Sequence, residues 1–157
     1  MKTILDDGYS WFLEKISYHE NLQLELVEAL LGGPENLKID DVSLGEVNRI
    51  ETSPKSRVVK VNFEDIIAWQ CLDESYTAHD DYEKSDDTGY IQIITRSKYL
   101  DYVNDNHGWY PITRNAEGKH YRVWTEDEVV DVVTLGEPEI ALKHPGNLST
   151  KRSLEGT

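Results

Sequence analysis

The sequence predicts a single α+β domain: a mainly antiparallel β-sheet with an N-terminal helix and one further helix packed on one face. Three observations predict this class. Apolar residues recur at helical spacing near the N-terminus, and they alternate with polar residues in several later segments. The turns between those segments are too short for parallel crossovers. With 157 residues, the chain has the usual length of one domain around one core.

The expected N-terminal helix runs over residues 18–31. Leucines recur there every four residues and so share one helical face (Leu22, Leu26 and Leu30). The Gly-Gly-Pro sequence at 32–34 is a typical helix stop. An alternative start near Asp7 would add Trp11, Phe12 and Ile16 to the same helix.

After this helix, apolar residues recur at every second position instead of every fourth. This alternation predicts strands at about 42–51, 58–63 and 66–76. Residues 52–56 have the composition of a hairpin loop between the first two strands. Glu64 and Asp65 would form a bulge or corner between the last two. The expected buried face of the sheet comprises Val59, Val61, Phe63, Ile67, Trp69, Val130 and Val132.

The C-terminal half alternates between loops and short regular elements. Residues 77–88 are acidic and aperiodic, which indicates a loop, and a strand follows at 90–95. Ser97 is a suitable N-cap for a second helix, in which Tyr99, Leu100 and Val103 would face inward. The chain then turns at 109–111. A hairpin of strands 120–124 and 129–135 is expected next, followed by a short strand at 140–142. We expect residues 1–143 to form the domain and residues 144–157 to be a mobile tail.

Bulk composition restricts the environment and the partners that we expect. Thirty acidic residues against 16 basic ones give a formal net charge of −14, which disfavours nucleic acid and favours cationic surfaces. The single cysteine, Cys71, excludes an internal disulfide and is expected to be buried and structural. No signal-like segment or long apolar run is present, so we expect a cytoplasmic protein that does not associate with membranes.

Motifs for catalysis are largely missing from the sequence. It has no phosphate-binding glycine loop, no HExxH, no GxSxG and no CxxC. The five histidines lack the spacing of metal ligands on one helical face, so we expect no cofactor and no metal. One catalytic alternative is a small hydrolytic or ligand-binding enzyme in which His107 and His120 meet, with Asp101 or Asp105 orienting one ring.

The strongest local signal is an acidic stretch at residues 64–87, which holds nine acids and one base, Lys84. Tyrosines lie among these carboxylates, and the combination suits a surface rich in lysine and arginine. The hypothesis is therefore a non-enzymatic, acidic interaction domain, such as an immunity or antitoxin-like protein that neutralises a cationic toxin. The alternative is a structural or regulatory homo-oligomeric subunit, for example a homodimer formed through a sheet edge. The expected partner-binding residues are Asp73, Glu74, Tyr76, Asp80, Asp81, Tyr82, Glu83, Asp86 and Asp87.

Overall fold

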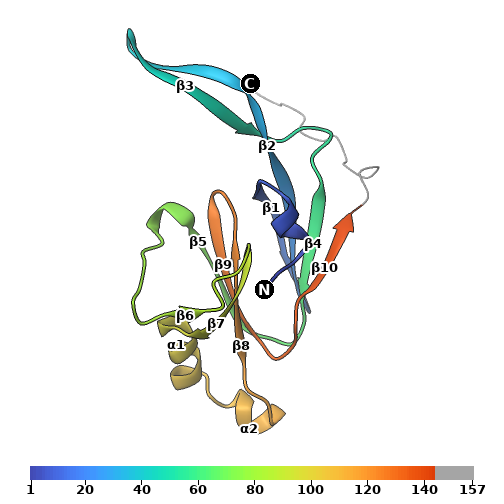
Figure 1. The fold of residues 1–157 in the computed structure, drawn as a ribbon. Helices are drawn as coiled ribbons and strands as arrows, with labels where there is room; N and C mark the ends of the chain where they lie inside the picture. Colours follow the sequence, from blue (N-terminus) through green and yellow to red (C-terminus); the bar gives the residue numbers. More distant parts are fainter. Residues whose placement is uncertain (144–157) are drawn as a thin grey trace, which may run out of the picture.

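The computed structural model describes residues 1–143 as a mainly antiparallel β structure with two five-stranded sheets (Figure 1). The predicted tail at 144–157 lies outside the described residues. The first sheet contains β1 (Ser10–Tyr18), β2 (Leu22–Ile39), β3 (Val42–Glu51), β4 (Val58–Phe63) and β10 (Glu139–Lys143). The second has the order β5 (Ile66–Asp73), β9 (Glu128–Thr134), β8 (Lys119–Trp124), β7 (Ile91–Arg96) and β6 (Lys84–Ser85).

The predicted N-terminal helix is wrong, because that segment forms the end of β1 and the start of β2. Leu22, Leu24 and Leu26 alternate along β2 and are fully buried between the sheets. Leucines four residues apart satisfy a strand as well as a helix, and pairing of β2 with β1 and β4 selects the strand. The predicted helix stop at 32–34 lies within β2, at a register irregularity. The only helical element before β1 is a 3-10 turn, η1 (Ile4–Asp7).

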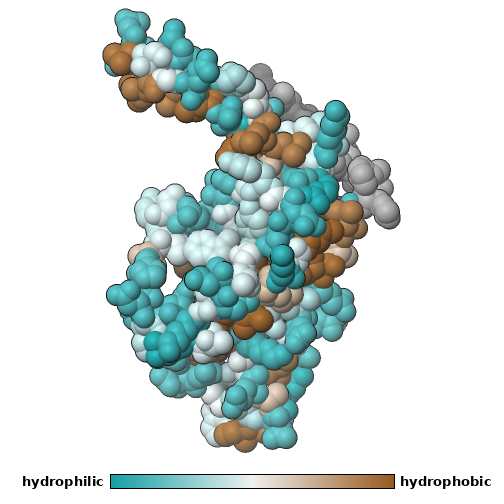
Figure 2. Space-filling view, in the orientation of Figure 1, coloured by the Kyte–Doolittle hydropathy of each residue, from teal (hydrophilic) through white to brown (hydrophobic). Residues whose placement is uncertain are grey.

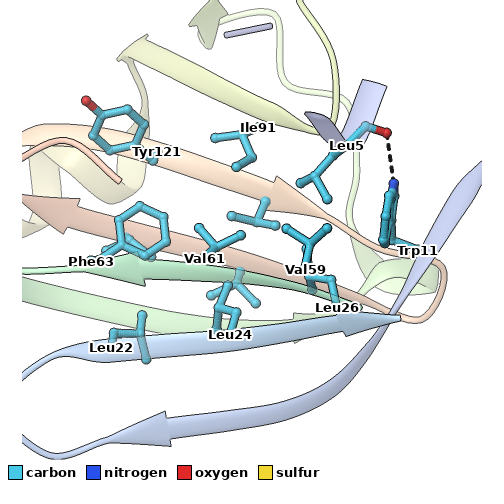
Figure 3. Packing of buried hydrophobic residues seen from close by; sticks show 13 residues of the cluster. Leu5, Trp11, Leu22, Leu24, Leu26, Val59, Val61, Phe63, Ile91 and Tyr121 are labelled. Atoms are coloured by element: carbon cyan, nitrogen blue, oxygen red, sulfur yellow. Dashed lines mark hydrogen bonds between the residues drawn. The ribbon is translucent and has the colours of Figure 1, made fainter. Parts of the chain in front are cut away.

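The main core lies between the two sheets (Figure 3). It includes five residues of the predicted buried face, all fully buried: Val59, Val61, Phe63, Val130 and Val132. Trp69 packs against this core while remaining partly exposed. Ile67 instead packs on the opposite side of β5, because the pairing of β5 with β9 shifts register between Ile66 and Ala68. The indole of Trp11 closes one end of the core by donating to the Leu5 carbonyl over 2.9 Å.

The chain passes from the first sheet to the second at the predicted corner. Asp65 has a left-handed backbone, with φ 49°, between β4 and β5. The hydroxyl of Thr134 bonds to the Glu64 and Asp65 carbonyls and fixes this corner against β9. The predicted hairpin joining 42–51 to 58–63 is wrong. Both strands are antiparallel to β2, so they run in the same direction and pair with successive parts of it.

The remaining predicted elements lie close to their expected positions. Ser97 caps α1 (Lys98–Asn106), and β8 and β9 form the predicted hairpin. The turn expected at 109–111 is instead the start of a short helix, α2 (Tyr110–Arg114). Cys71 is exposed rather than buried, because it lies near the end of the edge strand β5.

Beyond Leu30, β2 pairs only with β3, and the two strands form a ribbon that projects from the body (Figure 1). We call residues 31–51 the arm. Its residues are exposed except for Gly32 and Ile50, which are partly buried. One strand therefore has a buried half and an exposed half.

This division predicts opposite outcomes for two leucines of the same strand. Leu24→Ala should lower the free energy of unfolding by about 2–5 kcal/mol, because it opens a cavity in the main core. Leu37→Ala, at a position that is 45% exposed on the arm, should cost less than about 1 kcal/mol. Urea denaturation of both variants measures the difference. Equal destabilisation would mean that the arm is covered in solution.

Candidate functional site

The outer face of the second sheet holds a buried polar cluster. Along β8, Tyr121 and Val123 point into the main core, whereas His120, Arg122 and Trp124 point to the outer face. Asp131 of β9 lies directly opposite Arg122. The helices α1 and α2 and the loop at 77–88 lie over this face, and a small second core of Val103, Tyr110 and Val133 packs beneath the helices.

Ser97, His120 and Asp131 form a hydrogen-bonded chain. Ser97 Oγ lies 2.9 Å from His120 Nδ1, and His120 Nε2 lies 2.9 Å from Asp131 Oδ1. Serine hydrolases use the same three residue types, but there a substrate reaches the serine. Here the residues are 2%, 0% and 1% exposed, and Ser97 Oγ also accepts from the Leu100 amide at the start of α1. The arrangement is therefore an anchor for the helix.

Asp131 is the centre of the cluster. It accepts hydrogen bonds from His120, from Gln70 over 2.9 Å, and from Arg122 Nε over 2.7 Å. Burial alone would raise the pKa of Asp131, but the hydrogen bonds from His120 and Arg122 outweigh it and lower this pKa to about 2. Within residues 1–143, every buried side-chain nitrogen and oxygen atom has a hydrogen-bond partner. The cluster is thus a closed network.

Arg122 connects this network to the acidic loop. Its Nη1 lies 2.5 Å from Glu83 Oε1, and its guanidinium also lies 5.6 Å from the centre of the Trp124 ring. The indole of Trp124 donates to Gln92 Oε1 over 2.9 Å. These contacts fix one side of a pocket of about 330 Å³ beneath the loop, which is lined by Thr77, Ala78, His79, Asp80, Glu83, Ser85, Asp87, Gln92, Arg122 and Trp124.

Several of the predicted partner-binding residues have contacts within the chain. Asp80 pairs with Lys98 over 2.8 Å, Glu83 with Arg122, and Asp86 with the Met1 amino group. The hydrogen bond from Lys98 lowers the pKa of Asp80. Tyr82 donates to Asp101 over 2.6 Å and lies beneath Arg96. Asp73 caps the 3-10 turn η2 (Glu74–Tyr76). Asp80, Glu83 and Asp86, which were expected to contact a partner, thus anchor the loop to the rest of the chain.

Four of the predicted partner-binding residues remain largely free for a partner. Glu74, Tyr76 and Asp87 are exposed, and Tyr76 is 86% exposed. The carboxylate of Asp81 is fully exposed and contacts only the exposed ring of His79, over 3.1 Å. Asp87 lines the pocket. These four residues take no part in the ion pairs and caps that anchor the loop to the rest of the chain.

The proposed meeting of His107 and His120 is not observed. His107 is exposed at the end of α1 and stacks edge-on against Tyr102, whereas His120 is buried against Tyr99. Burial, together with the charge of Asp131, raises the pKa of Tyr99 to about 12, so this phenol stays neutral. Partial burial and the charge of Glu128 raise the pKa of the Cys71 thiol, which disfavours the reactive thiolate.

The buried network was missed by reasoning from the sequence, although one signal was present. Asp131 stands alone between two pairs of valines in a strand whose residues are otherwise suited to burial. A carboxylate at such a position needs partners that neutralise it. Its position in the sequence does not reveal which residues those are, since Ser97 and His120 belong to other elements.

Within residues 1–143, no group of three His, Cys, Asp or Glu side chains is placed to hold a metal ion. No helix in this range has the length and apolar character needed to cross a membrane. Comparison with models of protein families, with curated proteins and with solved structures finds no match to this chain.

The lowered pKa of Asp131 predicts a defined loss of stability in acid. A carboxyl whose pKa is lower in the folded state stabilises the fold above its unfolded pKa of about 3.9, and this contribution, about 2–3 kcal/mol, disappears as the pH falls towards 2. Asp131→Asn should remove this pH dependence. It should also cost about 3–5 kcal/mol at pH 7, because Arg122 and His120 lose their anionic partner. Urea denaturation at several pH values measures both effects.

The control for this experiment is Asp65→Asn, which removes an exposed ion pair with Arg114. It should cost less than about 1 kcal/mol. Asparagine also tolerates the left-handed backbone at this position. If Asp131→Asn destabilises the protein no more than this control, the buried network does not anchor the outer face.

Proposed function

We propose that the chain is a non-enzymatic, acidic interaction domain that binds a cationic protein through the loop at 77–88 and the pocket beneath it. The single observation that supports this most is the composition of the pocket. Three carboxylates line it beside the Trp124 indole: Asp80 and Glu83, which are paired with Lys98 and Arg122, and Asp87, which is exposed. Lysine or arginine side chains are favourably placed between carboxylates and an aromatic face.

The charges around the pocket favour a cationic ligand over an anionic one. Arg122 is the only arginine or lysine that lines it, and Asp131 and Glu83 already neutralise this guanidinium. Asp87 has no basic partner within residues 1–143; it accepts only from Ser85 over 3.4 Å. A phosphate or carboxylate ligand would therefore meet excess negative charge, whereas an ammonium or guanidinium group would be attracted.

We propose that the chain acts as an immunity or antitoxin-like protein, which neutralises a cationic toxin in the cytoplasm by this interaction. The formal charge of −14 supports this, since it accelerates association with a cationic partner. The homo-oligomeric subunit is the alternative, and the experiment that closes the next subsection distinguishes the two.

Burial argues against the enzymatic alternative. His120 and Ser97 lie beneath α1 and have their polar atoms engaged in the anchoring network, so a substrate does not reach them. His107 is accessible, but its ring contacts Tyr102 rather than a carboxylate that would orient it.

The test uses a labelled peptide of about 12 residues that alternates lysine and serine, comparable in length to one strand of the arm. Asp81→Asn with Asp87→Asn should weaken its binding several-fold, and should reduce the salt dependence of the binding constant, because fewer ions are released. Fluorescence anisotropy over about 0.05–0.5 M salt measures both. Thermal stability should change little, because Asp81 and Asp87 are exposed.

The matched control is Glu117→Gln with Glu139→Gln, which removes the same charge from exposed positions away from the loop. This control should leave peptide binding nearly unchanged. If both double variants weaken binding equally, only the net charge attracts the peptide, and the loop with its pocket is not a binding site.

A further inference from the structure

The arm has an apolar face that nothing within residues 1–143 covers. Its register places Ile39 opposite Val42, Leu37 opposite Gly45 and Glu35 opposite Val47, so these pairs share one face. Their aliphatic members are 43% to 63% exposed: Leu37, Ile39, Val42 and Val47. Figure 2 shows apolar side chains gathered along one side of the projecting arm.

A ribbon of two strands is marginally stable in water by itself. Along the arm, β2 pairs only with β3 and β3 only with β2, so the described chain leaves the outer edge of each strand free. Soluble proteins usually protect such edges or make them short and charged. A long ribbon with an aliphatic face and two free edges is suited to receive a further strand from another molecule.

The surroundings of the arm define the charge of that molecule. A pocket of about 310 Å³ at the base of the arm combines the apolar side chains of Phe12, Leu13 and Ile50 with Glu14, Glu51, Asp127 and Thr52. No ion pair within residues 1–143 neutralises these three carboxylates. The arm itself has an excess of acids, with Glu35, Asp40, Asp41, Glu46 and Glu51 against Lys38 and Arg49.

We propose that the arm is a second binding element, which receives a strand of alternating aliphatic and basic residues from the partner protein. The aliphatic side chains of that strand extend the face formed by Leu37, Ile39 and Val42. Its basic side chains lie on the other face, where they meet Glu46, and at the two ends of the arm they meet Asp40 and Asp41 of the turn and the acids of the pocket at the base. The inference rests on the proposed function for the cationic character of the partner, but the surface is a different one.

A second copy of the chain fits this surface less well. Two copies would each bring a formal charge of −14 to the interface. Self-association through the arms would also strengthen as salt screens the repulsion, whereas binding of a cationic strand weakens.

The experiment compares two labelled peptides of about 12 residues, one alternating lysine and valine and one alternating lysine and serine. The first should bind the full chain at least about tenfold more tightly, and it alone should slow amide hydrogen exchange in residues 31–51. In the variant Leu37→Ser, Ile39→Ser, Val42→Ser, this preference for the valine peptide should disappear, while binding of the serine peptide stays unchanged.

The control variant is Asn36→Ser with Asn48→Ser, on the other face of the arm; it should keep the preference for the valine peptide. Circular dichroism and thermal melting of each variant show whether the body remains folded. Equal affinity for the two peptides, or a preference that survives the triple substitution, would overturn the proposal. So would arm protection that rises with protein concentration and with salt in the absence of peptide, because the occupant would then be a second copy.

The two proposals fail in separable ways. Loss of the valine preference with Leu37→Ser, Ile39→Ser, Val42→Ser tests the arm alone. The effect of Asp81→Asn with Asp87→Asn on the serine peptide tests the loop alone. A protein in which only the second effect occurs binds cations without using the arm.

Discussion

A carboxylate buried in a β-sheet must be neutralised, and the outer face of this protein is organised by that requirement. Asp131 is fully buried between valines of β9 and accepts hydrogen bonds from three side chains. One of them, His120, continues to the cap of α1. Another, Arg122, continues to Glu83 in the acidic loop. One buried carboxylate therefore connects the cap of the helix with the acidic loop, and the ion pairs of Asp80 and Asp86 hold the loop in addition.

The fold was predictable where a pattern had a single interpretation. Alternation in β4, β8 and β9 identified the strands, and Ser97 identified the cap of α1. The end of β1 and the start of β2 were mistaken for a helix because leucines at positions 22, 26 and 30 fit both periods. Only the neighbouring strands decide between them, and these pairings are not local. A bulge or corner at Glu64 and Asp65 was expected within one long strand. Its left-handed backbone and its position between two separate sheets were not expected.

The candidate site was predictable as a region rather than as a set of residues. The acidic stretch does lie at a pocket, yet Asp80, Glu83 and Asp86 hold the loop in place through internal ion pairs. Their partners, Lys98, Arg122 and the Met1 amino group, are distant or unremarkable in sequence. A run of acids therefore overstates the charge that is available to a partner, because folding brings bases from elsewhere to part of it.

The pairing of β4 with β10 has a consequence for how the molecule assembles. Asn62 pairs with Glu139, so the whole second sheet lies in the chain between these two strands. Closing so long a loop is slow compared with forming the local hairpins. During synthesis β4 can pair with β2 as soon as both have emerged, but its other edge stays open until β10 follows. The apolar strand of Val59 and Val61 is then exposed to neighbouring chains, which makes incomplete chains prone to aggregate.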